Sequence, residues 1–319
     1  MLVIRVSEFG GPEVLEPVEV PDPVAGPGEV VVAVEAAGVL TLDTIIRRGN
    51  AGPRFATPLP YVPGRGAAGR VVAVGDGVDT ALLGRRVVAD AEGTYAERLV
   101  APVEALVPIP DGLGAPEAMT MLHDGGTALA VFGRLGVRPG ETVLVLPAAG
   151  GIGTMLVQLA RSAGARVIGA ARGAEKLELV RSLGADRAVD YGEPGWAEVV
   201  RRRTGQVDVV VDGVGGALGR EAFGLVAEGG RYSNYGLAGG APIPPDPDEV
   251  RSRAITVVGT DQLAGFVHER RARQERMLAE AAAGRITAVV GRTFALGKAA
   301  DAHTALENRE IPGKAVLIP

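Results

Sequence analysis

A short stretch of small residues offers the clearest chemistry in this sequence of 319 residues. The run Ala148-Ala149-Gly150-Gly151-Ile152-Gly153 follows an apolar segment, 142–146, and precedes a segment with helical periodicity. A helix that begins there presents backbone N–H groups and the positive end of its dipole, and both favour phosphate. Glycine lets a ligand approach the backbone and lets the helix pack closely on the strand. We therefore expect Gly150, Gly151, Ile152 and Gly153 to hold the pyrophosphate of a dinucleotide.

The next candidate residues indicate which dinucleotide this is. NAD-binding folds place Asp or Glu at the end of the second strand, roughly 20 residues after the glycines, to hold the ribose 2′-hydroxyl. This sequence has Arg172 at that place and Lys176 one helical turn later. A guanidinium pairs with a 2′-phosphate, which a carboxylate would repel. The cofactor expected is therefore NADPH; the alternative is that both residues are ordinary surface cations.

Thiol and metal chemistry are excluded by composition. The chain has no cysteine, so it has no disulfide, no thiolate nucleophile and no cysteine-ligated zinc. Its three histidines, His123, His268 and His303, lie far apart and lack partners at metal-ligand spacing. We therefore expect no metal site. His123 next to Asp124 could donate a proton, but neighbours on a helix point to different faces, which favours a structural role.

Charge and hydropathy exclude other classes of protein. The formal net charge is −5, the isoelectric point is near 5.4, and aromatic residues make up 4%. These values argue against a nucleic-acid partner. The sequence has no run of 18 apolar residues and no basic, apolar N-terminal leader, so we expect no membrane partner and a cytoplasmic location. The remaining partner class is a small-molecule substrate.

Two kinds of element position these residues. Up to about residue 115, short β-branched runs alternate with Gly and Pro, which predicts a compact β-barrel with strands at 30–34, 69–74 and 86–89. From residue 142, apolar strands alternate with helical segments, as in a parallel sheet. The expected strands are 142–146, 166–171, 187–190, 208–212, 229–233 and 255–259; the expected helices are 151–163, 174–183, 195–203 and 217–227. Residues 238–254 are expected to form a Gly/Pro-rich loop, 262–284 a helix and 314–318 a final strand.

The chain also resembles the zinc-independent medium-chain dehydrogenases/reductases, the zeta-crystallin-like quinone oxidoreductases. The likeness extends over most of the chain and is carried by residues 38–49, the segment Leu59-Pro60-Tyr61-Val62-Pro63-Gly64, the loop 148–153, residues 207–215 and residues 313–317. It implies an α/β fold in which a Rossmann domain is inserted into a GroES-like β-barrel catalytic domain. The implied limits are 1–117 and 258–319 for the catalytic domain and 118–257 for the Rossmann domain. It also implies a homodimer, paired through strand 255–259.

Position by position, the resemblance assigns further cofactor contacts. Tyr191, with Arg172 and Lys176, would surround the 2′-phosphate and the adenine. The nicotinamide end would lie near Thr127, Tyr235, Gly236 and Leu237. The sequence departs from the family at three positions: Leu40 usually corresponds to Asn, Ile45 often to Tyr, and Gly66, beside an unusual Arg65, to an acidic residue.

Two functions follow from these observations. The first is a metal-free, NADPH-dependent hydride transfer to a quinone or an α,β-unsaturated carbonyl, with hydrogen-bond donors stabilising the oxygen that becomes negative. Thr127 is the first candidate donor, with Tyr61 and Thr41 behind it. The second, motivated by Leu40 and Ile45, is an NADPH-binding protein with little catalysis that acts as a sensor or structural partner.

Overall fold

The computed structural model describes residues 1–236, 245–259 and 269–319. The chain forms two compact units: the first comprises Met1–His123 and Gln274–Pro319, and the second Asp124–Arg273. The domain limits expected from the sequence, 117/118 and 257/258, remain a prediction. Within the described ranges, no helix is long and apolar enough to cross a membrane.

The first unit is built on a mostly antiparallel sheet of seven strands. Their bounds are β3 (Glu29–Val39), β4 (Ala67–Val74), β5 (Arg86–Ala89), β6 (Arg98–Pro102), β7 (Leu106–Pro108), β14 (Val290–Ala295) and β15 (Lys314–Ile318). The order is β14-β15-β3-β4-β5-β7, and β6 pairs with β3. Strand β3 is long because its eleven residues, mostly valine and alanine, suit a buried strand. The C-terminal strand β15 pairs with β3, so the end of the chain completes the sheet that its beginning starts.

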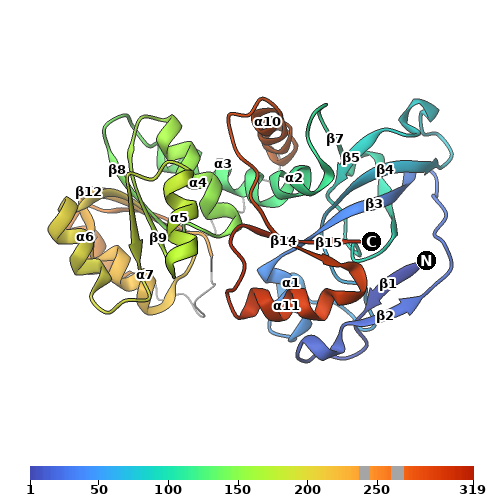
Figure 1. The fold of residues 1–319 in the computed structure, drawn as a ribbon, viewed down its shortest axis with the longest axis horizontal. Coiled ribbons are helices and arrows are strands. Elements are labelled where there is room, and N and C mark those ends of the chain that lie inside the picture. The colour runs from blue at the N-terminus through green and yellow to red at the C-terminus, as the bar shows by residue number, and fades with distance from the viewer. Residues whose placement is uncertain (237–244, 260–268) are drawn as a thin grey trace. The chain divides into compact units, whose positions relative to one another are not determined.

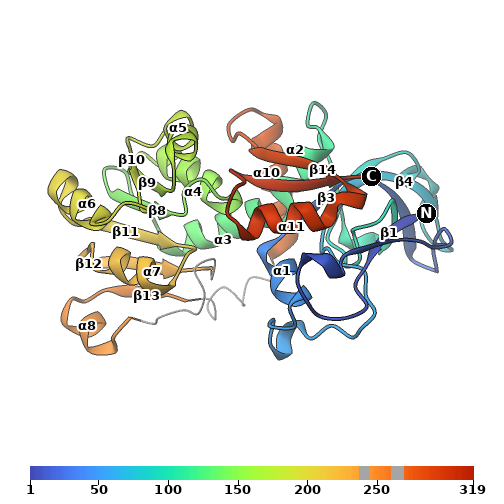
Figure 2. The ribbon, with the colours of Figure 1, turned by 60° about the horizontal axis from the view of Figure 1, so that its bottom comes forward.

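Smaller elements close the first unit. A separate ribbon pairs β1 (Leu2–Arg5) with β2 (Glu16–Glu19). The helices are α1 (Thr41–Arg47), α2 (Ala115–Thr120) and α11 (Ala299–Glu307), while α10 (Arg270–Ala282) crosses the division between the units. Helix α11 packs on β14 and β15 and also contacts α1 (Figure 2). Neither α1 nor α11 was expected from the sequence, and these two helices carry the buried residues Asp43, Arg47 and His303.

The second unit is a parallel sheet of six strands in the order β10-β9-β8-β11-β12-β13. The strands are β8 (Thr142–Leu146), β9 (Arg166–Ala171), β10 (Arg187–Asp190), β11 (Val207–Asp212), β12 (Val226–Asn234) and β13 (Thr256–Val258). Every pairing among them is parallel. Strand β8 comes first of these strands in the chain but lies in the middle of the sheet. The strands that follow it extend the sheet first on one side of β8 and then, from β11 onward, on the other. In open α/β sheets, ligands bind at the carboxyl ends of strands beside such a reversal.

Helices cover both faces of this parallel sheet. They are α3 (Gly126–Leu135), α4 (Gly151–Ser162), α5 (Ala174–Ser182), α6 (Trp196–Thr204), α7 (Gly216–Phe223) and α8 (Pro247–Ser252). Helices α4 and α5 lie on one side of the strands, and α6 and α7 on the other (Figure 1). The core under α6 and α7 includes Leu144, Ile168, Trp196 and Phe223, all at most 2% exposed. Burial on both faces explains the nearly continuous apolar strands.

Two of the departures from the expected elements have a clear physical reason. The helix expected over 217–227 ends at Phe223, because Val226 already pairs with Val207 in the sheet. The expected loop 238–254 contains helix α8, which starts at Asp246, whose side chain accepts a hydrogen bond from Asp248 N. Asp at the N-cap followed by Pro is a helix-start signal that the Gly/Pro-rich context hid.

Candidate active site

The loop between β8 and α4 has the geometry expected of a phosphate-binding turn. Gly150 is the N-cap of α4 and has extended backbone angles, and no side chain caps the helix. The N–H groups of its first turn have no partner within the helix itself. Gly150 and Ile152 are both partly exposed. A twelve-residue helix with an uncapped, accessible N-terminus fits the pyrophosphate of NADPH.

Each glycine of this loop has its own physical reason. A Cβ on Gly153 would lie 1.9 Å from the carbonyl oxygen of Pro147, so α4 packs directly on the loop backbone. A Cβ on Gly151 would lie 2.0 Å from Oδ2 of Asp124, a carboxylate that is 6% exposed. Glycine is therefore required at position 151 because a side chain there would clash with Asp124. It also lets a ligand approach the backbone.

The predicted 2′-phosphate residues gather at the ends of the next two strands. Arg172 follows β9 and is exposed, and its guanidinium lies 6.0 Å from the ring centre of Tyr191, which follows β10. Lys176 is partly exposed in the first turn of α5. Asp190 fixes the backbone on both sides, because its carboxylate accepts hydrogen bonds from Gly173 N (2.8 Å) and Gly192 N (2.7 Å). A cation stacked on an aromatic ring is a suitable receptor for a phosphate next to an adenine.

Three of the residues predicted for the nicotinamide end, Tyr235, Gly236 and Leu237, follow β12 in the sequence. Tyr235 N donates to the carbonyl of Asp212 (2.8 Å), and the Tyr235 ring covers Gly213, where a Cβ would lie 2.5 Å from it. Burial, together with the nearby Asp212 carboxylate, raises the pKa of Tyr235. The amide of Asn234 donates to the carbonyl of Gly236 (3.2 Å). Leu237 lies outside the described residues.

Asp212 organises this corner, and the sequence reasoning did not single it out. It is fully buried, and its Oδ1 accepts hydrogen bonds from Val214 N (2.7 Å) and Gly215 N (2.9 Å). Its Oδ2 accepts from the Tyr232 hydroxyl (2.7 Å) and from the Asn234 amide (3.0 Å). One carboxylate thus links the turn that follows β11 to the end of the neighbouring strand β12. An aspartate that ends an apolar strand just before a glycine was the available signal.

The two threonines predicted as hydrogen-bond donors lie in different settings. Thr127 is the second residue of α3 in the second unit and is partly buried. Thr41 is the first residue of α1 in the first unit and is exposed. It does not line the pocket described next.

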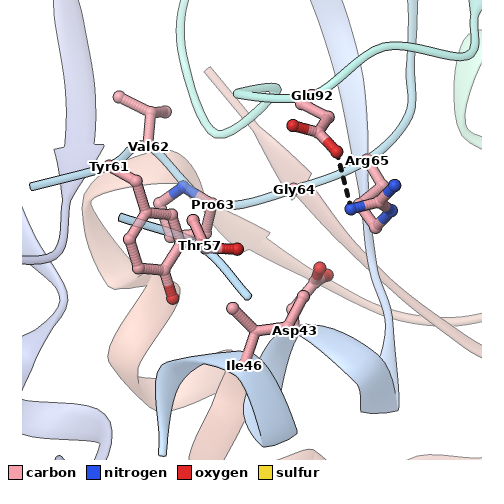
Figure 3. Close-up of a pocket in the computed structure, with 9 residues that line it drawn as sticks. All are labelled: Asp43, Ile46, Thr57, Tyr61, Val62, Pro63, Gly64, Arg65 and Glu92. Atoms are coloured by element: carbon pink, nitrogen blue, oxygen red, sulfur yellow. Dashed lines mark ion pairs between the residues drawn. The ribbon is translucent and has the colours of Figure 1, made fainter. Parts of the chain in front are cut away.

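The third predicted donor, Tyr61, lines a pocket in the first unit. Side chains of Asp43 and Ile46 rise from α1 and face Thr57 and Tyr61 on the segment before β4 (Figure 3). The pocket has about 70 Å³ of free space. The hydroxyl of Tyr61 is buried and makes no hydrogen bond to any described residue. Burial, and then the charge of Asp43, raises the pKa of Tyr61 to about 12, so its hydroxyl stays protonated and can donate.

Charged groups complete the wall of this pocket. Arg65 forms an ion pair with Glu92, with 2.8 Å between Nη1 and Oε1 (Figure 3). Arg65 is partly exposed and Glu92 is exposed, so this ion pair contributes little to stability. It places a guanidinium within reach of a bound ligand. The sequence reasoning noted Arg65 only as an unusual neighbour of Gly66.

Asp43 is the most unusual group of the pocket. It is 2% exposed, and its Oδ2 accepts hydrogen bonds from Leu40 N (2.8 Å) and from the Tyr95 hydroxyl (3.1 Å). The first bond fixes the start of α1. Burial raises the pKa of Asp43 to about 6 against the opposing effects of these two bonds and of Lys314 and Arg65.

A chain of buried side chains continues behind Asp43. His303 Nε2 lies 3.0 Å from the Tyr95 hydroxyl, and His303 Nδ1 lies 3.3 Å from Arg47 Nη1. Arg47 is fully buried, and its Nη2 donates to Glu307 (2.5 Å). Burial, together with the charge of Arg47, lowers the pKa of His303 to about 3. The folded protein therefore keeps His303 neutral at physiological pH.

His123 explains why position 66 is glycine. A Cβ on Gly66 would lie 2.7 Å from Leu122 and 2.8 Å from His123 Nε2, so these side chains fill the space of the missing one. His123 Nε2 lies 2.9 Å from the carbonyl oxygen of Arg65 and 3.9 Å from a carboxylate oxygen of Asp90. The π-helical turn Met121–Gly125 presents this ring. Within the described ranges, no group of three or more His, Cys, Asp or Glu side chains is arranged to hold a metal ion.

Comparison with known proteins agrees with both units. Residues 151–302 match the family model described as zinc-binding dehydrogenase, and residues 26–111 match the one described as alcohol dehydrogenase GroES-like domain. The chain is 32% identical to mouse quinone oxidoreductase, over 95% of this chain and 93% of that one. It is 34% identical to 2-haloacrylate reductase of a Burkholderia species, over 98% of both. A mycobacterial protein solved with NADPH has a TM-score of 0.90, with 35% identity and full coverage of both chains.

Proposed function

Because the chain belongs to the zeta-crystallin-like quinone oxidoreductases of the medium-chain dehydrogenase/reductase superfamily, we propose that it is an NADPH-dependent reductase. Its acceptor is a quinone or a C=C bond conjugated to a carbonyl. The fold is the α/β fold of that family, a GroES-like domain together with a Rossmann domain.

One observation carries the proposal: the uncapped N-terminus of α4 is followed, after β9, by Arg172 above Tyr191. Bound NADPH supplies a hydride. Residues 150–153 bind the pyrophosphate, and Arg172 and Lys176 bind the 2′-phosphate beside Tyr191. Tyr235, Gly236, Leu237 and Thr127 position the nicotinamide.

The acceptor needs groups that stabilise negative charge, because hydride addition leaves an anion on its oxygen. Preorganised hydrogen-bond donors perform this task in a site that excludes water. Tyr61 carries a buried hydroxyl without a partner among the described residues, and Arg65 adds a guanidinium. Among the three predicted donors, Tyr61 therefore has the strongest support.

The test is NADPH oxidation by the purified protein against a panel of quinones, enones and α,β-unsaturated acids. We expect turnover with electron-poor quinones or enones and a lower rate with NADH at equal concentration. Unsaturated acids belong in the panel because a relative is named for reduction of a haloacrylate and because Arg65 lines the pocket. If NADPH binds but no acceptor is reduced, the protein is a cofactor-binding sensor or structural partner instead.

Two further assignments belong to this proposal. A homodimer is supported by strand β13, which lies at the edge of the six-stranded sheet and pairs with β12 on its inner side. Such an edge can pair with a second copy. A cytoplasmic location is supported by the cysteine-free sequence, which suits a reducing compartment. Sedimentation and cell fractionation test the two assignments.

A further inference from the structure

Two polar atoms at the pocket of the first unit have no hydrogen-bond partner among the described residues. One is the buried Tyr61 hydroxyl. The other is Oδ1 of Asp43, because both hydrogen bonds to this carboxyl are accepted by Oδ2. Asp43 lines the pocket, so Oδ1 is the oxygen available to a ligand there (Figure 3). A buried polar atom is normally satisfied, so the Tyr61 hydroxyl, in the same pocket as Asp43, indicates a site built for a polar ligand.

The hydrogen bonds among the buried side chains behind Asp43 have a fixed direction from donor to acceptor. Arg47 carries only donors, so His303 Nδ1, 3.3 Å from it, must accept. His303 therefore carries its proton on Nε2 and donates it to the Tyr95 hydroxyl. Tyr95 in turn donates to Asp43 Oδ2. Every bond of the chain thus points toward Asp43.

This direction determines where Asp43 holds its own proton. Oδ2 already accepts two hydrogen bonds, from Leu40 N and from the Tyr95 hydroxyl, so a protonated Asp43 carries its hydrogen on Oδ1. The acidic hydrogen then faces the pocket. Lys314 and Arg65 act on Asp43 from β15 and from the pocket wall, and both favour its ionised form. Burial opposes them, so Asp43 titrates near pH 6 and can both hold and release a proton.

We propose that Asp43 is the proton donor of the reduction, with Tyr61 holding the acceptor oxygen in the same pocket and Tyr95, His303 and Arg47 as positioning residues. This inference rests on the proposed function. Free space of about 70 Å³ accommodates roughly five water molecules, so the pocket takes the reacting end of the acceptor rather than a large molecule.

The step balances as follows. Hydride addition reduces the acceptor by two electrons and leaves an enolate, or a hydroquinone anion from a quinone. The O–H bond at Asp43 Oδ1 breaks, and the proton forms the Cα–H bond of the saturated ketone or the O–H bond of the hydroquinone. Asp43 is left as a carboxylate and takes a proton from water at the pocket. The Tyr95 hydrogen bond stabilises this carboxylate and keeps its orientation.

The first test is the pH dependence of kcat with the best acceptor. A required acid makes the wild-type rate fall as the pH rises through about 6, because Asp43 then loses its proton. Asp43→Asn keeps an amide oxygen that can accept both hydrogen bonds. Its kcat should be about a hundredfold lower and should no longer fall as the pH rises through about 6. Tyr95→Phe removes a hydrogen bond that lowers the pKa of Asp43, so kcat of this variant should fall at a higher pH than kcat of the wild type. Asp111→Asn, an exposed position in the same unit, is the matched control and should behave as wild type.

A second readout uses 2-methylcyclohex-2-enone, whose reduction creates a stereocentre at the protonated carbon. The wild type should give one enantiomer in excess, since Asp43 delivers the proton from one face. Asp43→Asn should give nearly racemic product at its residual rate, since water then supplies the proton. A purely structural role for Asp43 would lower the rate and leave the enantiomeric excess unchanged.

A third readout needs neither cofactor nor turnover. Infrared titration of the protein alone should show a carboxyl that protonates near pH 6, absent in Asp43→Asn and moved upward in Tyr95→Phe. If this signal is absent, or if Asp43→Asn keeps the pH limb and the enantiomeric excess, the inference is wrong and the proposed function stands. If the wild type reduces no acceptor, both are wrong.

Discussion

At the scale of single residues, the pKa values of His303 and Asp43 are shifted in opposite directions. Burial raises the pKa of Asp43 to about 6 and lowers that of His303 to about 3. Near pH 5 the unfolded chain carries an ionised Asp43 and a protonated His303, whereas the folded protein carries a protonated Asp43 and a neutral His303. Both states bind one proton on this pair. Stability should therefore depend little on pH through the pair between about pH 4 and 6.

When either His303 or Asp43 is replaced, the stability of the protein should depend on pH through the residue that remains. In His303→Gln, Asp43 alone remains, and the folded state binds the extra proton, so stability should fall as pH rises from about 4 to 6, by about 3 kcal/mol. In Asp43→Asn, His303 remains, and the unfolded state binds the extra proton, so stability should fall as pH falls from 6.5 toward 3. Urea denaturation across this range measures both slopes. Equal slopes in both variants and the wild type would contradict the assigned shifts.

At this same scale, we predict that Arg172 and Lys176 select NADPH over NADH. Replacing both with Ala should weaken NADPH binding about ten- to a hundredfold and leave NADH binding nearly unchanged, because charge-assisted hydrogen bonds contribute about 1.5–3 kcal/mol each when shielded and less when exposed. Fluorescence titration with both cofactors at one salt concentration measures the difference. Arg203→Ala, exposed on α6, is the control cation. Equal loss of both cofactors would refute the assignment.

At the scale of elements, the contact between α4 and its preceding loop holds the N-terminus of the helix in place. Gly153 lies so close to Pro147 that only a hydrogen fits between the two backbones. The helix therefore cannot shift without moving the end of β8. This contact fixes the direction of the first-turn N–H groups, which we propose bind the pyrophosphate.

Gly153→Ala should break this contact. Its Cβ would meet a backbone oxygen at 1.9 Å, so α4 must move, and we expect a loss of about 1–3 kcal/mol in stability together with most NADPH affinity. Gly133→Ala is the matched control, since it lies in α3 with nothing within 4 Å of the added carbon. It should raise stability by up to about 1 kcal/mol, because alanine favours a helix. Thermal unfolding and NADPH titration compare the two; similar results would contradict the packing argument.

At the scale of the whole molecule, the sheet of the second unit ends at β13. Edge strands invite pairing with another chain, and charges on them prevent it. Thr256 in β13 is exposed. It is therefore a position where a charge should affect assembly without disturbing the core.

Thr256→Lys should convert the proposed homodimer into monomers. In a two-fold pairing of β13, the new lysines of both copies come close together and repel. Thr80→Lys, exposed in the first unit, should stay dimeric. Analytical ultracentrifugation gives the mass of each variant. A monomeric wild type, or a dimeric Thr256→Lys, would exclude β13 as the interface.

Local sequence determined the second unit almost completely. Strands 142–146, 166–171 and 187–190 have the bounds expected, because a parallel sheet buried on both faces requires apolar runs that the sequence displays. The glycine run and Arg172 were also visible, since the proposed phosphate loop and its cation lie close together in the sequence; their roles stay predictions. Leu237, part of the same assignment, lies outside the described residues.

Only the tertiary structure decided the chemistry of the first unit. Asp43, Tyr95 and His303 come from helix α1, the segment before β6 and helix α11, so no spacing in the sequence relates them. The C-terminal segment returns to the first unit, where β15 pairs with β3. Helix α11 therefore packs in this unit, and its His303 joins the hydrogen-bonded side chains behind Asp43. The pKa of Asp43 depends on burial and on neighbours remote in sequence. The sequence around Asp43 does not indicate its burial, and packing makes it a buried acid that lines a pocket.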